Sequence, residues 1–199
     1  MLLLIVNAIL FAKESKGKNQ KYYVLTIYLI TLSVIETICN YIGFFKPGNN
    51  LFLSHFYFNF QFLFLSFFFY QLFENPFLKK IIVFAFIAVY AFLIIQYYLK
   101  PEIFWGFNLP EILSISFILI AYSLIHLYNN LGEIKKYYYF CIGLIMYLLC
   151  SSIIFMSGNF ELVFFQDPYI DIWIFNSLLY IVYQILILKE WKLLTSKSL

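Results

Sequence analysis

The chain has 199 residues, of which 64% are hydrophobic and 12% are charged, and its mean hydropathy is +0.87. No soluble domain of this length can bury so much apolar side chain, so the sequence predicts that lipid is its main solvent. All 13 basic residues are Lys, and the formal net charge of +3 is spread over short loops. Because the loops form no basic patch, direct binding to nucleic acid is not expected.

Long apolar runs predict the fold class. Six of them are long enough to cross a membrane as helices, at 22–45, 51–73, 81–99, 108–128, 137–157 and 171–188. Residues 1–12 are a seventh candidate, although a helix of this length covers only about 18 Å and is too short to cross unaided. We therefore expect an all-α, polytopic transmembrane helical bundle of six to seven helices, forming a single domain over residues 1–199.

The run 51–73 is the most unusual of these segments, because ten of its 23 residues are Phe. Alternating Phe residues are typical of a strand, but a lone strand in lipid would leave its backbone N–H and C=O groups unpaired. A helix is therefore predicted. On a helix, its polar residues His55, Asn59, Ser66 and Tyr70 follow one face.

Lysines in the connections predict the orientation. Alternate connections together carry eleven Lys on one side of the membrane and two on the other. Since positive loops remain in the cytoplasm, the C-terminus is predicted to be cytoplasmic. The expected location is the bacterial inner (cytoplasmic) membrane, crossed several times.

Polar side chains inside the predicted spans are the candidate functional residues, because an ionisable group in hydrocarbon is costly unless it is paired or hydrated. Glu36 shares a helix face with Asn40, and the antiparallel run that follows places His55 and Asn59 at a similar depth. Several later residues enter from the same side. We expect one outward-facing cluster of six residues: Glu36, Asn40, His55, Asn59, Glu111 and Asn176.

Three interpretations of this cluster are open. Its members could form only hydrogen bonds between helices. They could instead line a hydrated pocket for a ligand, or a path for protons or ions. Glu36, His55 and Glu111 could also form a His/carboxylate metal site, although nothing in the sequence shows that they converge. The sequence therefore assigns no metal ligand, and we expect no cofactor.

A second set of polar residues lies in the predicted inner half of the spans. Gln71, His126 and Gln184 are candidates for an inner polar path. The alternative is that both Gln residues form contacts between helices and that His126 is an interfacial side chain near the end of its span.

The sequence carries no recognisable catalytic signature. It contains no HExxH, GxSxG, CxxC or glycine-rich phosphate loop. Only two His are present, which gives little support to the zinc chemistry of membrane lipid hydrolases. No connection is long enough to form a soluble domain. We therefore expect a protein without catalysis of its own.

Several short motifs resemble those of small multi-pass bacterial membrane proteins. They lie at Glu36, 49–51, His55, 61–66, 111–113, 122–124, Tyr147, 151–155 and 173–176. The chain resembles, among these, the membrane accessory proteins encoded beside type VI-B RNA-targeting CRISPR nucleases. One accessory type there carries an R-x4-H motif, which a chain without Arg cannot contain.

Three functions follow as hypotheses. The resemblance implies an oligomeric accessory or effector of a bacterial defence system that acts at the membrane. A pore is one mode of action that it implies. A protein partner at the cytoplasmic face is another expectation. The polar cluster predicts instead a sensor or ligand-binding module that is coupled to a signalling partner. The third hypothesis is an intramembrane metal-dependent lipid hydrolase. In each case the lipid bilayer is a partner, and a homo-oligomer is expected for the first.

Overall fold

The computed structural model describes residues 1–45, 50–131, 136–159 and 172–196. Over these residues the chain forms seven α-helices and one 3-10 helix, with no strand. In chain order they are α1 (Leu2–Lys13), α2 (Gln20–Phe45), α3 (Leu53–Leu72), α4 (Pro76–Leu99), η1 (Pro101–Trp105), α5 (Leu109–Tyr128), α6 (Tyr138–Asn159) and α7 (Ile172–Ser196). The predicted all-α class is confirmed, and the Phe-rich run is a helix.

Two helices extend five or more residues beyond the apolar runs that predicted them. α4 begins at Pro76 rather than at residue 81, because Asn75 caps it: its side chain accepts a hydrogen bond from the N–H of Phe77 at 2.9 Å. α7 continues beyond residue 188 to Ser196. In both cases the backbone remains helical through polar residues, which hydropathy alone does not detect.

Four helices in the described part of the chain are long and apolar enough to cross a membrane: Gln20–Phe45, Pro76–Leu99, Leu109–Tyr128 and Tyr138–Ser157. α1 is apolar but shorter. α3 is not among the four, because His55, Asn59 and Gln61 interrupt its apolar surface. The structure thus supports a membrane protein.

The chain divides into two compact units, residues 1–115 and 116–199, with the boundary inside α5. In the first unit α1 packs on α2, where the rings of Phe11 and Tyr22 stack at 5.1 Å, and α2 packs closely on α3. The expectation of a single domain remains a prediction.

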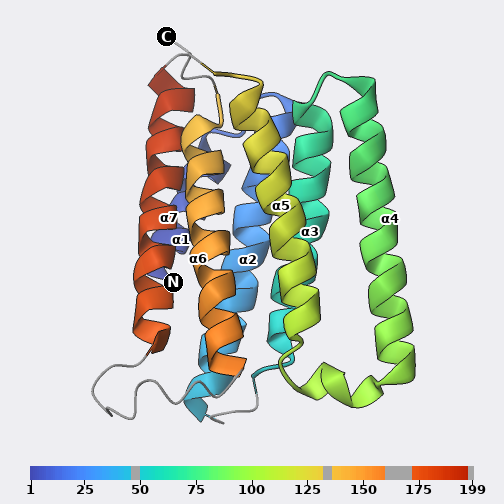
Figure 1. Cartoon of the computed structure of the whole chain (residues 1–199). Coiled ribbons are helices and arrows are strands. Elements are labelled where there is room, and N and C mark those ends of the chain that lie inside the picture. The colour runs from blue at the N-terminus through green and yellow to red at the C-terminus, as the bar shows by residue number, and fades with distance from the viewer. Residues whose placement is uncertain (46–49, 132–135, 160–171, 197–199) are drawn as a thin grey trace. The chain divides into compact units, whose positions relative to one another are not determined.

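α4 stands apart from α3 over much of its length (Figure 1). Only Ile82, Val89 and Leu93 of α4 are buried, whereas Phe84 is 75% and Ile94 is 68% exposed. An apolar helix with so much exposed surface is suited to contact with lipid.

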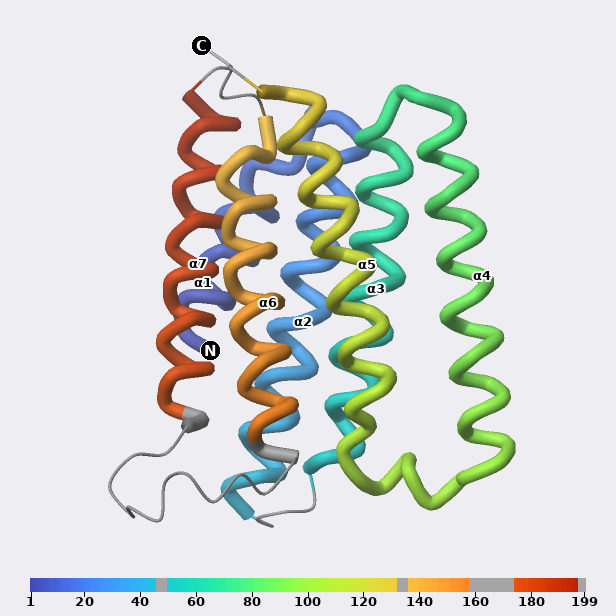
Figure 2. Tube along the Cα trace, viewed as in Figure 1, coloured from blue at the N-terminus to red at the C-terminus, as the bar shows by residue number. Residues whose placement is uncertain are grey.

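Figure 2 shows that the chain leaves α4 through η1 and returns to α5 at the end where α3 begins. This return brings the start of α5 to the first turns of α3.

In the second unit α6 and α7 lie in close contact. At Gly143 a Cβ atom would lie 2.9 Å from Cδ2 of Tyr183, so this position of α6 has no room for a side chain unless Tyr183 moves. The rings of Tyr147 and Tyr183 stack at 5.5 Å.

The buried Glu190 accepts hydrogen bonds from the backbone N–H groups of Tyr137, Tyr139 and Phe140 at the start of α6, at 2.5, 2.9 and 3.4 Å.

Candidate ligand site

The site begins with the way the sequence starts α5. Asn108 precedes the helix, and its Oδ1 accepts a hydrogen bond from the N–H of Glu111 at 3.4 Å. In an ordinary capping box, an acidic residue at this position folds back onto the N–H of the cap. Here the Glu111 carboxylate forms its hydrogen bonds with side chains of α3 and α4 instead. Local capping therefore fixes the backbone while the carboxylate joins three helices.

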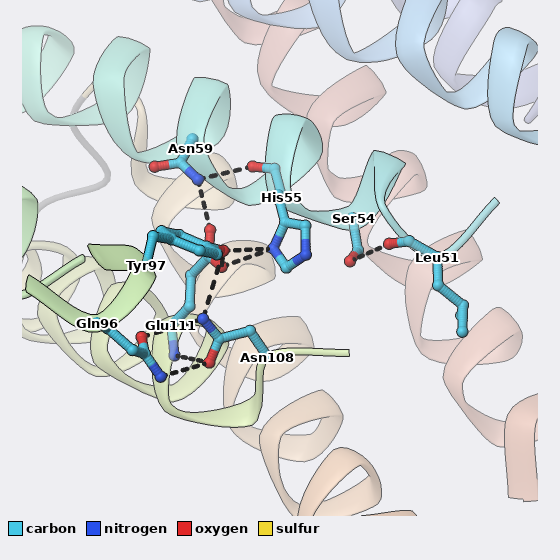
Figure 3. A network of polar contacts seen from close by, with 8 residues as sticks. All are labelled: Leu51, Ser54, His55, Asn59, Gln96, Tyr97, Asn108 and Glu111. Atoms are coloured by element: carbon cyan, nitrogen blue, oxygen red, sulfur yellow. Dashed lines mark hydrogen bonds and ion pairs between the residues drawn. The ribbon is translucent and has the colours of Figure 1, made fainter. Parts of the chain in front are cut away.

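Three side chains converge on the Glu111 carboxylate (Figure 3). Asn59 of α3 donates its Nδ2–H to Oε1. Tyr97 of α4 donates its hydroxyl to Oε2 at 2.6 Å, and His55 Nδ1 lies 2.7 Å from the same oxygen. The side chain of Glu111 has no exposed surface. Because a buried carboxylate is costly without polar partners, these three contacts are what allow it to remain there.

The side-chain amides of Gln96 and Asn108 form a reciprocal pair of hydrogen bonds next to the network. Gln96 Nε2 donates to Asn108 Oδ1 at 3.0 Å, and Asn108 Nδ2 donates back to Gln96 Oε1 at 3.0 Å. Asn108 Nδ2 also lies 3.4 Å from the Tyr97 hydroxyl. The pair ties the end of α4 to the start of α5, so the Tyr97 hydroxyl is held beside Glu111.

Aromatic rings enclose the His55 imidazole. Phe104 of η1 stacks on it, with ring centroids 5.4 Å apart and planes at 19°, and Tyr97 meets it edge-on at 5.6 Å. Its Nδ1 also lies 2.8 Å from the Tyr97 hydroxyl. These rings fix the imidazole plane, so that Nδ1 faces both polar partners.

A pocket of about 290 Å³ opens beside this network. Its wall includes the polar side chains His55, Asn59, Tyr90 and Tyr97, and its other lining residues are apolar or aromatic. The volume approaches that of small-molecule sites, which are largely apolar with a few fixed polar groups. The arrangement can orient a small polar group by hydrogen bonds while burying an apolar part.

A second pocket of about 390 Å³ lies farther along α3 and α4, and Leu63 belongs to the walls of both. Ser66 and Tyr70 line this second pocket. The four polar residues predicted to follow one face of the Phe-rich helix therefore all lie along the space between α3 and α4.

No family model, no curated protein and no solved structure matches this chain.

Of the six residues predicted to form one outward cluster, the structure brings three together: His55, Asn59 and Glu111. Glu36 lies elsewhere on α2, where its Oε1 is 3.1 Å from the amino group of Met1. Asn40 donates its Nδ2–H to the Glu36 carbonyl at 2.7 Å. The contacts of His55, Asn59 and Glu111 include neither residue, because the cluster faces α4 and the start of α5 rather than α2.

The sixth residue, Asn176, lies on α7 in the second unit. Its part in an outward cluster thus remains a prediction. The metal-site alternative of Glu36, His55 and Glu111 finds no support, since the described residues contain no group of three or more His, Cys, Asp or Glu that could hold a metal ion.

The three residues predicted for an inner polar path lie in both units. Gln71 is half-buried near the end of α3, in the first unit. His126 and Gln184 are buried in the second unit. His126 Nε2 lies 3.3 Å from the Lys136 carbonyl, and its Nδ1 lies 3.3 Å from the Asn130 side chain. The inner path stays a prediction.

Sequence reasoning missed Tyr97, Gln96, Asn108 and Tyr90. Tyr97 stands at the end of a predicted span, where a Tyr is typical of the membrane interface. A usable signal was nevertheless present: Gln96 and Asn108 lie on either side of a short connection that begins at Lys100-Pro101. Polar residues that flank a short connection between antiparallel helices end up close together, as these two amides do.

Proposed function

We propose that this protein is a non-enzymatic membrane protein that binds a small ligand in the pocket beside Glu111 and is coupled to a signalling partner. The observation that carries this proposal is the convergence of Asn59, Tyr97 and His55 on a buried carboxylate at the wall of an open pocket. A network that served only to join helices would not need to border a space of this size.

The polar groups suit recognition better than catalysis. Tyr97, His55 and Asn59 each have a hydrogen bond to Glu111 that fixes their orientation. Preorganised donors of this kind lower the cost of binding, because fewer side-chain rotamers are lost when the ligand arrives. A ligand that exchanges one of these hydrogen bonds would loosen the tie between α3, α4 and α5. Such a change in helix packing is the signal we propose.

Trp105 gives a direct readout of the pocket. Its ring centroid lies 5.3 Å from that of Phe104, which lines the pocket. A variant with Trp173→Phe and Trp191→Phe leaves Trp105 as the single Trp, which is excited selectively at wavelengths that Tyr hardly absorbs. The experiment measures its emission in purified protein titrated separately with a membrane-lipid extract and a polar-metabolite extract.

We expect one extract to shift the emission and the shift to disappear in Tyr97→Phe. The matched control is Tyr98→Phe, because Tyr98 is 85% exposed and is not a wall residue of the pocket. Emission that neither extract changes, or that changes equally in both Tyr variants, would refute a ligand site at Glu111.

The membrane arrangement belongs to the same proposal. We propose a multi-pass protein of the bacterial inner membrane with a cytoplasmic C-terminus, in which α3 and α7 cross in addition to the four apolar helices. The lysine distribution supports this orientation, and α3, with 20 residues, is about 30 Å long, which matches the hydrocarbon core. Labelling of single introduced cysteines from each side of the membrane tests it.

The defence-accessory hypothesis remains a prediction that rests on the resemblance, as do homo-oligomerisation, a pore and a cytoplasmic partner. Ion or dye flux through liposomes that contain the purified protein tests it. Flux from a defined oligomer, lost when Gln71, His126 or Gln184 is replaced by Leu, would favour an effector over a binding module.

A further inference from the structure

The two pockets lie one after the other along α3 and α4. They share Leu63, and their walls come from successive turns of the same two helices. The pocket near the start of α3 reaches His55 and Tyr97, and the pocket farther along α3 reaches Tyr70 and Ile82. We call the two pockets together the α3–α4 groove.

The groove is long and narrow. From His55 to Tyr70, α3 advances about 22 Å at about 1.5 Å per residue. That length is a large part of the roughly 30 Å hydrocarbon core of a bilayer. Along it the α3 wall is mainly Phe and Leu, including Phe60, Phe64 and Phe67. A compact polar metabolite would fill only the end beside His55 and Tyr97, whereas a long hydrocarbon chain matches the whole length of the groove.

The polar end of the groove selects the charge of the ligand. No Lys, Asp or Glu is among the described residues that line either pocket. An anionic head beside His55 would lie near the Glu111 carboxylate, which is unfavourable in a low dielectric. No Lys lines the pockets to offset that repulsion, and the His55 imidazole is already paired with Glu111. A cationic head could not reach Glu111, because that side chain has no exposed surface and three donors surround it.

An uncharged head with hydroxyl or carbonyl groups avoids both problems. It can exchange hydrogen bonds with Tyr97, His55 and Asn59, which offer both donors and acceptors. At the far end of the groove, Lys79 Nζ lies 5.3 Å from the centroid of the Tyr70 ring. The ammonium group of Lys79 is therefore at the opposite end of the groove, about 22 Å along α3 from the polar head.

We propose that the α3–α4 groove binds a neutral long-chain amphiphile, with its uncharged head at His55, Asn59 and Tyr97 and its hydrocarbon chain along α3. This inference rests on the proposed ligand site and names its ligand class. It also gives the weakly packed α4 a role, because a chain between α3 and α4 would fill the space that the two helices leave.

The test compares three probes that share one hydrocarbon chain: oleyl alcohol, oleyl sulfate and oleyltrimethylammonium. Each is titrated in lipid nanodiscs into the full chain that carries Trp173→Phe and Trp191→Phe, where Trp105 emission measures binding. Each is also titrated into the unmodified full chain, where native mass spectrometry measures it. We expect oleyl alcohol to bind at least about tenfold more tightly than either charged probe.

Two substitutions locate the site. Leu63→Trp blocks the groove where the pockets meet, and we expect it to abolish binding of oleyl alcohol. Leu149→Trp is its control, because Leu149 of α6 is 45% exposed, close to the 38% of Leu63, and is not among the residues that line the two pockets. Tyr97→Phe removes one hydrogen bond and should weaken binding about fivefold, a change of about 1 kcal/mol, while Tyr98→Phe should not.

Equal binding of the neutral and charged probes would overturn the inference, as would binding that survives Leu63→Trp. The comparison of probes on the unmodified protein keeps the inference testable even if Leu63→Trp does not fold. If only the polar-metabolite extract shifts Trp105 in a Tyr97-dependent way, the proposed ligand site stands and the amphiphile is wrong. If neither extract nor any probe does so, both fail.

Discussion

Glu111 and Glu190 are both fully buried carboxylates, one in each unit of the chain, and they are held in different ways. Glu190 accepts hydrogen bonds from three backbone N–H groups at the start of α6. Glu111 is held by the side chains of Asn59, Tyr97 and His55. Burial alone therefore does not mark a functional carboxylate.

The kind of donor makes the difference. Backbone N–H groups at a helix N-terminus are fixed by the helix and carry partial positive charge, so a carboxylate there stabilises the fold. Tyr137, at the start of α6, has a φ of 70°, and Glu190 bonds to its N–H. Side-chain donors can rotate and exchange partners. Glu111 therefore belongs to a network that a ligand could rearrange, whereas Glu190 has the features of a structural cap.

The largest effect should come from removing the structural carboxylate. Glu190→Ala leaves three backbone donors at the start of α6 without this acceptor, and we expect a loss of about 3 kcal/mol in the free energy of unfolding. Thermal or denaturant unfolding of the purified protein measures it. Glu102→Ala, at an exposed position of η1, is the control and should change little. Equal losses in both variants would contradict the assigned role of Glu190.

A smaller loss of stability is expected for Glu111→Gln. The amide keeps the size of the side chain and one oxygen that accepts hydrogen bonds, while the side chains around it can reorient, so we expect a loss of about 1–2 kcal/mol. Ligand-dependent emission of Trp105 should nevertheless disappear. Glu36→Gln makes the same chemical change at a carboxylate with 19% exposure and should leave that emission intact. If Glu36→Gln abolishes the ligand-dependent emission of Trp105 and Glu111→Gln does not, the functional carboxylate is Glu36.

The smallest effect should come from the amides behind Glu111. In a double-mutant cycle of Gln96→Leu and Asn108→Ser, the Ser retains an N-cap oxygen for α5 but cannot form the reciprocal pair. We expect a coupling free energy of about 1 kcal/mol between the two positions. Unfolding of the two single variants and the double variant measures it. Additive losses would show that the pair does not act as a unit.

The sequence was sufficient to predict the all-α class, because the length of its apolar runs reports directly on local structure. It also predicted that His55 and Asn59 share a face, since residues four apart on a helix always do. It placed both Glu36 and Glu111 in the cluster with them, and could not predict that only Glu111 would contact them. That choice depends on which neighbouring helix the polar face of α3 meets, and nothing in the spacing along the chain specifies helix packing.

The reciprocal bonds between Gln96 and Asn108 have a consequence for inheritance. Each amide satisfies the other, so a change at one position leaves a polar group in a poorly hydrated place, whereas two matched apolar residues would leave none. Among descendants of this gene, we therefore expect the two positions to change together more often than separately. Tyr97, which adjoins Gln96 and contacts Asn108, should tolerate the fewest replacements whenever that pair is kept.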